Sequence, residues 1–242
     1  DSGPRSPQSP TPKAQIMIRL IGIDIDGTLL DSRGQMPDAY LDGLSATERA
    51  AGFSIDTRSL APGEGFVAIR GPIRDGHAFV AAALDQGAAC AVVDRTFPPG
   101  DEERLVRVDD TLEALNDLGR ASRARLTEAV VIAVTGSAGK TGTKEALKLA
   151  LQPSGSVHAS AKSFNNHWGV PLSLANMPRD IRFGVFEIGM NHAGELAALT
   201  RLVRPHVAIV TAIAPAHREY FASEEAIADA KGEIFEGLEA GG

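Results

Sequence analysis

An apolar run, a glycine-rich loop and a helical pattern follow one another between residues 130 and 151. The run VVIAV is rich in β-branched residues and uninterrupted, as expected for a parallel strand that is covered on both faces. The helical segment after the loop ends before Pro153 and Gly155. It carries an apolar face at helical spacing, made of Ala146, Leu147, Ala150 and Leu151. This stretch therefore predicts a strand, a tight loop and a helix in direct succession.

The loop between that strand and that helix has the composition of a phosphate-binding loop. Gly136 and Gly139 allow backbone N–H groups to turn inward at a helix N-terminus, where a triphosphate can be bound. Lys140 would reach the β- and γ-phosphates, and the Thr141 hydroxyl would bind Mg²⁺. The strict pattern GxxxxGK[ST] is not met, because Val134 stands at its first glycine. The alternative is a glycine turn before an ordinary amphipathic helix.

Composition restricts the class of protein. The 242 residues suffice for one large domain or two ordinary ones, and a hydrophobic content of 43% is typical of a globular chain. A net charge of -7 without a lysine and arginine cluster argues against a nucleic-acid partner. No apolar run approaches the roughly 18 residues of a membrane span, and no signal-peptide pattern opens the chain. The single cysteine, Cys90, is expected in a buried strand; no disulfide can form within the chain, so we expect a cytoplasmic protein. We also expect a monomer.

The first 42 residues differ from the rest. Residues 1–15 are rich in proline and serine and are expected to be a disordered tail. The strand-turn segment 16–42 contains DIDGT, which resembles the first motif of the haloacid dehalogenase phosphatases. That resemblance implies that Asp24 is a nucleophile and Asp26 a general acid/base. Because the pattern that follows is different, the alternative is a strand and turn without phosphatase partners.

Strand and helix patterns alternate along the remaining chain, which predicts an α/β fold with right-handed βαβ units and parallel sheets. We expect a small N-terminal α/β domain over 43–110, followed by a P-loop-type parallel-sheet ATP-binding domain over 111–242. The expected elements are a short strand at Phe53, a turn at Pro62-Gly63, strands at 65–69, 89–93, 181–188 and 206–213, and helices at 78–84 and 111–126. Helical patterns follow the last two strands.

Ligands of open parallel sheets bind beyond the carboxyl ends of the strands. Glu187 stands near the end of one predicted strand, and His217 follows the next one. A carboxylate beside a phosphate loop is well placed to hold Mg²⁺, either directly or through water. The alternatives are a solvated strand end for Glu187 and a structural role for His217.

Six segments, taken in order, resemble the Mur ligase family over about residues 53–242. They are SIDTRSLAPGEGFVAIRG, DGHAFVAAALDQGAACAVV, TGSAGKT, NNHWGVPLSLA, EIGMNHAGEL and AHREYFASEEAIADAKGEIFEGL. The family uses the shorter loop form TGxxGK[ST], which this chain has. The resemblance implies an ATP- and Mg²⁺-dependent ligase of peptidoglycan precursor synthesis. Such an enzyme joins D-alanyl-D-alanine to a UDP-N-acetylmuramoyl-tripeptide through an acyl phosphate.

The resemblance also implies roles for individual residues. Lys231 matches a lysine that becomes a carbamate in related ligases, and it would act with Lys140, Glu187 and His217 in catalysis. The metal ligands would be Thr141, Glu187, His217 and Lys231. ATP would be bound by Thr135, Gly136, Ser137, Ala138, Gly139, Lys140, Thr141, Asn165 and Asn166. Substrate would be bound by Ser54, Asp56, Thr57, Arg58, Asn191 and His192, with Asp75, Gly76 and His77 as further matches.

Members of this family continue well past the position that matches Lys231, through the rest of the nucleotide domain and a third domain. The sequence ends at Gly242. We therefore expect a C-terminally truncated chain whose own activity is open. The alternatives are a non-catalytic ATP-binding fragment of such a ligase and a phosphatase that uses Asp24 and Asp26.

Overall fold

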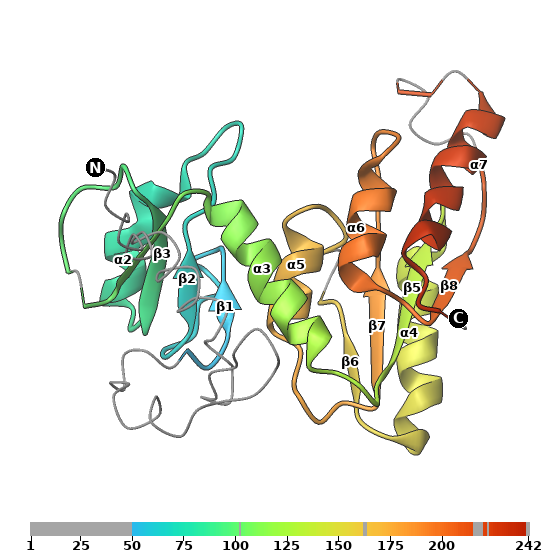
Figure 1. Cartoon of the computed structure of the whole chain (residues 1–242), viewed down its shortest axis with the longest axis horizontal. Helices are drawn as coiled ribbons and strands as arrows, with labels where there is room; N and C mark the ends of the chain where they lie inside the picture. The colour runs from blue at the N-terminus through green and yellow to red at the C-terminus, as the bar shows by residue number, and fades with distance from the viewer. Residues whose placement is uncertain (1–49, 102, 162–163, 215–219, 222, 241–242) are drawn as a thin grey trace, which may run out of the picture. The chain divides into compact units, whose positions relative to one another are not determined.

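The computed structural model describes residues 50–101, 103–161, 164–214, 220–221 and 223–240 (Figure 1). The chain divides into two compact units, Asp1–Ala114 (unit 1) and Leu115–Gly242 (unit 2). Each unit has its own parallel sheet, so the α/β class predicted from the sequence is confirmed. The predicted disordered tail, Asp24 and Asp26 lie outside the described residues.

Unit 1 contains a four-stranded sheet in the order β1-β2-β3-β4, and all neighbouring strands are parallel. The strands are β1 (Phe53–Ser54), β2 (Gly65–Val67), β3 (Cys90–Asp94) and β4 (Leu105–Val108). Between β2 and β3 lie a 3₁₀ turn, η3 (Gly76–Phe79), and the helix α2 (Val80–Asp85). A helix that connects two parallel strands is the βαβ unit that the sequence predicts.

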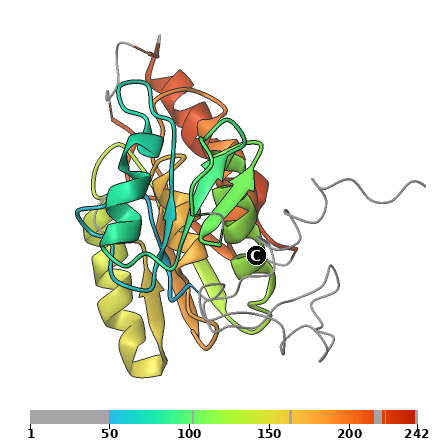
Figure 2. The same cartoon turned by 90° about the vertical axis from the view of Figure 1, so that its left-hand side faces the viewer.

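The core of unit 1 forms where α2 packs on one face of this sheet (Figures 1 and 2). Val80 and Ala83 of the helix pack against Phe66, Ala91 and Val93 of the strands. Cys90, at the start of β3, is buried as predicted. Burial raises the pKa of its thiol to about 11, which disfavours the reactive thiolate.

Unit 2 contains a second parallel sheet in the order β6-β7-β5-β8. Its strands are β5 (Val130–Thr135), β6 (Val157–Ala159), β7 (Phe183–Glu187) and β8 (Val207–Val210). The chain moves from β5 to one side, through β6 and β7, and then crosses to β8 on the other side of β5. The end of β5 is therefore the point where the strand order reverses, and ligands of open α/β sheets bind at such points.

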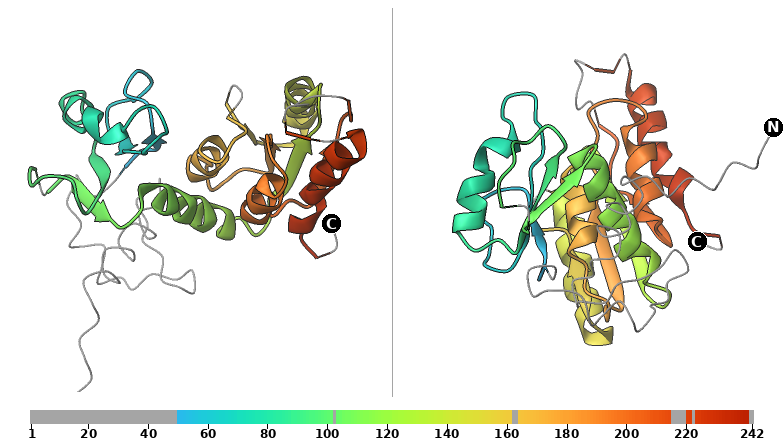
Figure 3. Two further views of the ribbon diagram at one scale, coloured as in Figure 1. Left: turned by 90° about the horizontal axis from the view of Figure 1, so that it is seen from above. Right: turned by 60° about the vertical axis from the view of Figure 1, so that its left-hand side comes forward.

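Helices cover both faces of the unit 2 sheet (Figure 3, left). They are α4 (Lys140–Leu151), α5 (Gly169–Ala175), α6 (Glu195–Val203) and α7 (Glu224–Gly232), with the 3₁₀ turns η4 (Gln152–Ser154) and η5 (Glu233–Gly237). The alternate residues Ile132 and Val134 of β5 belong to the core on the α4 side. Val131 and Ala133 belong to the larger core, which includes residues of α5, α6 and α7. An uninterrupted apolar strand thus fills two cores at once.

The apolar face predicted for α4 needs correction. Leu147 and Leu151 pack against the core, but Ala146 and Ala150 are exposed. Lys144, about one turn before Leu147 and two turns before Leu151, is instead the buried residue of this helix. The buried face of the helix is thus turned away from Ala146 and Ala150 and toward Lys144.

Other differences concern the limits of elements. The predicted strand 65–69 is shorter (β2), and the predicted helix 78–84 begins as η3 and continues as α2. The helix α3 (Thr111–Ala124) confirms the prediction for 111–126 to within two residues, and the boundary between the units falls inside it. Among the described strands and α-helices, β4, β6 and α5 had no sequence prediction. Within the described part of the chain no helix is long and apolar enough to cross a membrane.

Candidate functional site

The loop after β5, residues 135–141, is called the glycine loop here. It leaves the strand at Thr135 and enters α4 at Lys140. Gly136 and Gly139 have φ values of +150° and +83°, which side chains rarely allow. At Gly136 a Cβ atom would also lie 2.0 Å from the Thr211 hydroxyl oxygen. The backbone path therefore requires glycine at both positions. The N-terminus of α4, a helix of 12 residues, follows directly after Gly139.

A short segment after β8, residues 211–214, supports the glycine loop. The Thr211 hydroxyl lies 2.5 Å from the Ala138 carbonyl and 3.1 Å from the Thr135 carbonyl. The Ser137 N–H donates to the Ala212 carbonyl, and the Ser137 hydroxyl donates to the Ala214 carbonyl. Sequence reasoning missed Thr211. Its position at the end of a predicted strand beside the loop strand was the signal that could have found it.

Glu187, the last residue of β7, is only 1% exposed and faces the start of α4. Its carboxylate accepts a hydrogen bond of 2.8 Å from the Thr141 hydroxyl. The other carboxylate oxygen accepts one of 2.8 Å from the side-chain amide of Asn165. The Asn165 carbonyl in turn accepts the Gly189 N–H at 2.7 Å. The structure therefore brings together Thr141, Asn165 and Glu187, which the sequence analysis proposed separately.

Two lysines complete the charge pattern of the site. The Lys140 ammonium donates to the Gly136 carbonyl at 2.8 Å, across the glycine loop. Lys231, near the end of α7, is 2% exposed. Burial, and secondarily the positive charge of Lys140, lower the pKa of Lys231 to about 8. The positive charge of Lys140 therefore reaches Lys231, which makes Lys231 a candidate member of the same site.

The remaining predicted residues of unit 2 lie in short turns. Asn166 accepts the N–H groups of Trp168 and Gly169 with its side chain and so caps the start of α5. Asn191 and His192 precede α6 and are both exposed. The carboxylate of Glu195 accepts the Asn191 N–H and lies 3.1 Å from the His192 ring nitrogen Nδ1.

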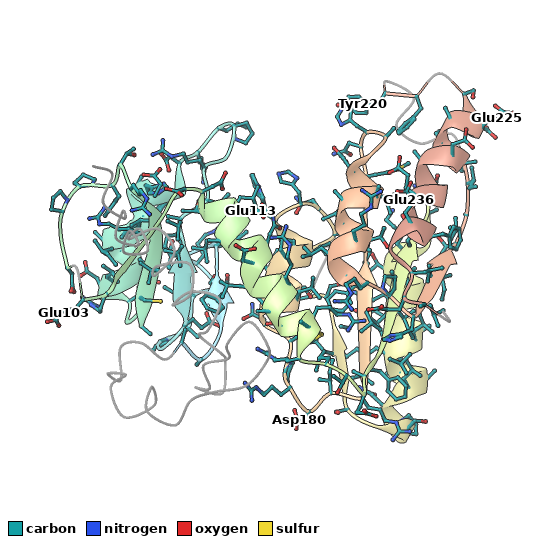
Figure 4. The ribbon with its side chains drawn as sticks, viewed as in Figure 1. Glu103, Glu113, Asp180, Tyr220, Glu225 and Glu236 are labelled. Carbon is teal, nitrogen blue, oxygen red and sulfur yellow. The ribbon has the colours of Figure 1, made fainter. Side chains whose placement is uncertain are left out.

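The turn before α6 has two further neighbours. The ring of Tyr220, labelled in Figure 4, lies 4.5 Å from the His192 ring, centroid to centroid. The carboxylate of Glu233 accepts the N–H groups of Gly194 and Ala197. Glu233 lies two residues after Lys231, so the end of α7 also caps α6. The substrate predictions for Asn191 and His192 thus fall on a turn that is fixed by residues near Lys231.

The predicted residues of unit 1 form two separate groups. Ser54 is buried, and its hydroxyl accepts the Asp56 N–H. Asp56 holds the Arg58 guanidinium through two carboxylate oxygens, at 2.9 Å and 2.6 Å. The side chain of Arg58 is 84% exposed, so the guanidinium is oriented and open to an anionic ligand. Thr57, which lies between Asp56 and Arg58 in the sequence, is half-buried.

Asp75 and His77 are bonded within unit 1. The Asp75 carboxylate accepts the His77 N–H and lies 2.6 Å from its Nδ1 atom. The other ring nitrogen of His77, Nε2, accepts the Asp94 N–H at 3.0 Å. Gly76 between them allows a close approach, since a Cβ atom there would lie 2.7 Å from the Ile69 nitrogen. These contacts join the η3 turn to the end of β3.

The residues around Glu187 suit a hard cation. Mg²⁺ prefers oxygen ligands, and the site offers the Thr141 hydroxyl and a buried carboxylate. Both hydrogen bonds to that carboxylate come from neutral groups, so neither of them brings a positive charge to it. Among the described residues no group of three or more His, Cys, Asp and Glu side chains converges on one point. His217, the other predicted ligand, lies outside those residues.

Comparison with known proteins identifies the family. Residues 49–123 match the family model described as Mur ligase family, catalytic domain, and residues 134–242 match the one described as Mur ligase middle domain. The UDP-N-acetylmuramoyl-tripeptide–D-alanyl-D-alanine ligase of Rickettsia prowazekii is 40% identical over 180 residues, which are 74% of this chain and 40% of the relative.

Solved structures agree with the sequence matches. A crystal structure of MurF from Acinetobacter baumannii is similar at 31% identity and a TM-score of 0.72, over 94% of this chain and 46% of that one. The MurF ligase of Thermotoga maritima in complex with ADP gives 31% identity and a TM-score of 0.68, over 78% of this chain and 43% of that one. The chain thus spans less than half the length of each relative, and it belongs to the Mur ligase family.

Proposed function

We propose that this chain supplies the nucleotide site and the UDP-substrate site of an ATP-dependent ligase of peptidoglycan precursor synthesis. The ligase adds D-alanyl-D-alanine to a UDP-N-acetylmuramoyl-tripeptide. The relatives that match over most of the described residues carry that name, and one similar structure holds ADP. The observation that carries the proposal is the cluster of Thr141, Asn165 and Glu187 beside the glycine loop, where Lys140 bonds across the loop to the Gly136 carbonyl.

The proposed reaction has two steps. A carboxylate oxygen of the tripeptide attacks the γ-phosphorus of ATP, the bond to the β-phosphate oxygen breaks, and ADP leaves. The amine of D-alanyl-D-alanine then attacks the acyl carbon, phosphate leaves with the former carboxylate oxygen, and a proton is lost from nitrogen. Negative charge grows on phosphoryl oxygens in the first step, and Lys140 is placed to stabilise it. Mg²⁺, held by Thr141 and Glu187, would supply further positive charge to the phosphates.

Lys231 would take part as a carbamate. A neutral amine adds carbon dioxide by forming a new N–C bond and releasing a proton, so a low pKa favours the reaction. Burial and Lys140 lower the pKa of Lys231 to about 8, which leaves far more neutral amine near neutral pH than an ordinary lysine has. The carbamate exchanges a positive charge for a negative one, and it would offer oxygen ligands beside the nucleotide.

In unit 1 the exposed guanidinium of Arg58, held by Asp56, would bind the diphosphate of the UDP substrate, with Ser54 and Thr57 in the same turn. The Asn191–His192 turn would contact the substrate near the reacting carboxylate. We expect the whole enzyme to act in the cytoplasm, where ATP is available.

To test this function, the chain is incubated with ATP, Mg²⁺, D-alanyl-D-alanine and UDP-N-acetylmuramoyl-tripeptide, and the release of ADP is measured. ADP release that requires the tripeptide, and that disappears in Lys140→Ala, supports the proposal. Binding of ATP without any affinity for the tripeptide would instead favour a nucleotide-binding fragment. ATP hydrolysis at the same rate with and without the tripeptide would contradict the proposed reaction.

A further inference from the structure

Lys144 is completely buried, with an exposed fraction of 0%, although the reaction proposed above gives it no role. It lies one helical turn after Lys140 in α4, on the face that also carries Leu147 and Leu151. An ammonium group removed from water is costly unless it is paired and hydrogen-bonded, and methionine or leucine would fill the same face without that cost. The partners of the Lys144 ammonium group therefore indicate what this lysine is placed to hold.

The ammonium group of Lys144 reaches the carboxyl end of β6. It donates a hydrogen bond of 2.9 Å to the carbonyl of Ser160, the residue that follows β6. It also lies 3.1 Å from a carboxylate oxygen of its neighbour Glu145, whose side chain is half-exposed. The pairing with Ser160 thus crosses from the helix to the loop that leads toward Asn165.

Ser160 in turn holds Glu187. Its hydroxyl oxygen accepts the backbone N–H of Glu187 at 3.1 Å, and its own N–H donates to the Val185 carbonyl at 3.1 Å. α4 is therefore joined to Glu187 in two ways. Thr141 bonds the carboxylate directly, and Lys144 holds Ser160, which bonds the backbone of Glu187.

We propose that Lys144 is a positioning residue that fixes Glu187 against Thr141 and so sets the strength of Mg²⁺-dependent nucleotide binding. The inference rests on the proposed function, because it assumes that ADP and Mg²⁺ bind at this site. Lys140 and the loop N–H groups bind phosphate without help from Glu187. A change at Lys144 should therefore affect only the part of the affinity that Mg²⁺ adds.

The test is calorimetric titration of ADP into the chain, once with Mg²⁺ and once with a chelator, for Lys144→Met. We expect the increase in ADP affinity caused by Mg²⁺ to fall by about tenfold, the value of one or two lost hydrogen bonds to a charged group. ADP affinity in the chelator should stay the same, and the thermal midpoint should not fall. Lys148→Met is the matched control, since Lys148 lies one turn later in the same helix and is only half-buried. It should change neither quantity.

Ser160→Ala provides a second variant in case Lys144→Met fails to fold. It removes the oxygen that accepts the Glu187 N–H and should reduce the Mg²⁺ increment in the same way. An unchanged increment in a folded Lys144→Met or Ser160→Ala protein overturns the inference while the proposed function stands. Failure of the unaltered chain to bind ADP overturns the proposed function, and the inference with it.

Discussion

Four charged residues of unit 2 are almost fully buried. One of them, Arg123, is bonded to the carbonyls of Val203 and Arg204. The other three lie in or near the glycine loop site. Lys144 and Lys231 are 0% and 2% exposed, and Glu187 is 1% exposed. Charged groups are rarely buried unless they are paired, because water solvates them better than protein does. Side chains that serve a reaction commonly reduce the stability of the fold. We therefore expect the buried charged residues of this site to lower the free energy of unfolding.

Lys231 provides a direct measure of this cost. Lys231→Met should raise the free energy of unfolding at pH 7 by on the order of 1 kcal/mol, because a buried cation is replaced by an apolar chain of similar length. The same variant should lose nucleotide-dependent reactions. Chemical denaturation measures the free energy of unfolding of Lys231→Met and of the unaltered chain. Lys140→Met is the control, because it also removes one positive charge from the site.

The pH dependence of this difference has a defined sign. The folded pKa of Lys231 is lowered to about 8 from an ordinary value of 10.5. Between those values the unfolded chain binds more protons, so the lysine penalises the folded state most at low pH and less as pH rises above about 8. The advantage of Lys231→Met should therefore shrink above pH 8. If the stability advantage of Lys231→Met instead grows with pH, burial does not lower the pKa of Lys231.

At the scale of elements, the glycine loop depends on a strand that is distant in sequence. β5 and β8 pair in parallel, with Thr135 opposite Val210, and the chain then continues beside the loop as residues 211–214. The loop carbonyls of Thr135 and Ala138 meet the Thr211 hydroxyl there. The shape of the loop is therefore a property of two strands together.

Thr211→Val tests this dependence. Valine keeps the shape of threonine but cannot donate to the Ala138 carbonyl, so the loop should lose its fixed path. We expect ADP affinity to fall by about fivefold, while Thr211→Ser, which keeps the hydroxyl, stays near the unaltered value. Titration calorimetry gives the affinities, and thermal melting verifies the fold. Equal affinity for valine and serine would mean that the hydroxyl does not hold the loop.

His206 links the starts of β5 and β8. Its Nδ1 atom accepts the Val131 N–H at 2.9 Å, which requires that nitrogen to be unprotonated. Burial, and then the charge of Arg123, lower the pKa of His206 below its ordinary value of 6.5. The stability that His206 provides is thus complete above 6.5 and is lost as pH falls through the lower folded pKa.

His206→Asn should therefore weaken the dependence of stability on acid. The Asn side-chain oxygen can accept the same N–H but does not titrate. We expect the fall in thermal midpoint between about pH 7.5 and about pH 5 to be smaller in the variant than in the unaltered chain. If both proteins lose the same number of degrees, His206 does not titrate between those values in the folded state.

The sequence predicted the elements whose patterns are local. The strand-loop-helix at 130–151 was found because β-branched residues, two glycines and a helical period follow one another. The strands β4 and β6 are short, and α5 (GVPLSLA) is buried along its whole length, so neither a strand period nor an amphipathic face marks them. The position of Lys144 was missed because the rotation of α4 is set by packing on β7 and β6. The bond between Thr141 and Glu187 depends on sheet order, which no local pattern contains.

At the scale of the whole molecule, the turn predicted to bind the UDP part of the substrate and the predicted nucleotide site lie in different units. Ser54, Asp56, Thr57 and Arg58 belong to unit 1, whereas the glycine loop, Glu187 and Lys231 belong to unit 2. Each unit has its own sheet and core. The two binding functions should therefore be separable by substitution.

Arg58→Ala and Lys140→Ala form the pair that tests this separation. Arg58→Ala should weaken binding of the UDP-linked tripeptide by at least roughly tenfold and leave ADP affinity unchanged, because one charge-assisted contact is lost. Lys140→Ala should do the opposite. Calorimetry with each ligand and each variant gives four affinities. A loss of both affinities in either variant would mean that the sites are not separate.

The most direct test of the account is titration of ADP with Mg²⁺ into the unaltered chain, Lys140→Ala and Glu187→Gln. A nucleotide site at the glycine loop predicts binding by the unaltered chain, loss of binding in Lys140→Ala, and in Glu187→Gln an affinity that no longer depends on Mg²⁺. Binding that is the same in all three proteins, or absent in the unaltered chain, would contradict a nucleotide site at the glycine loop.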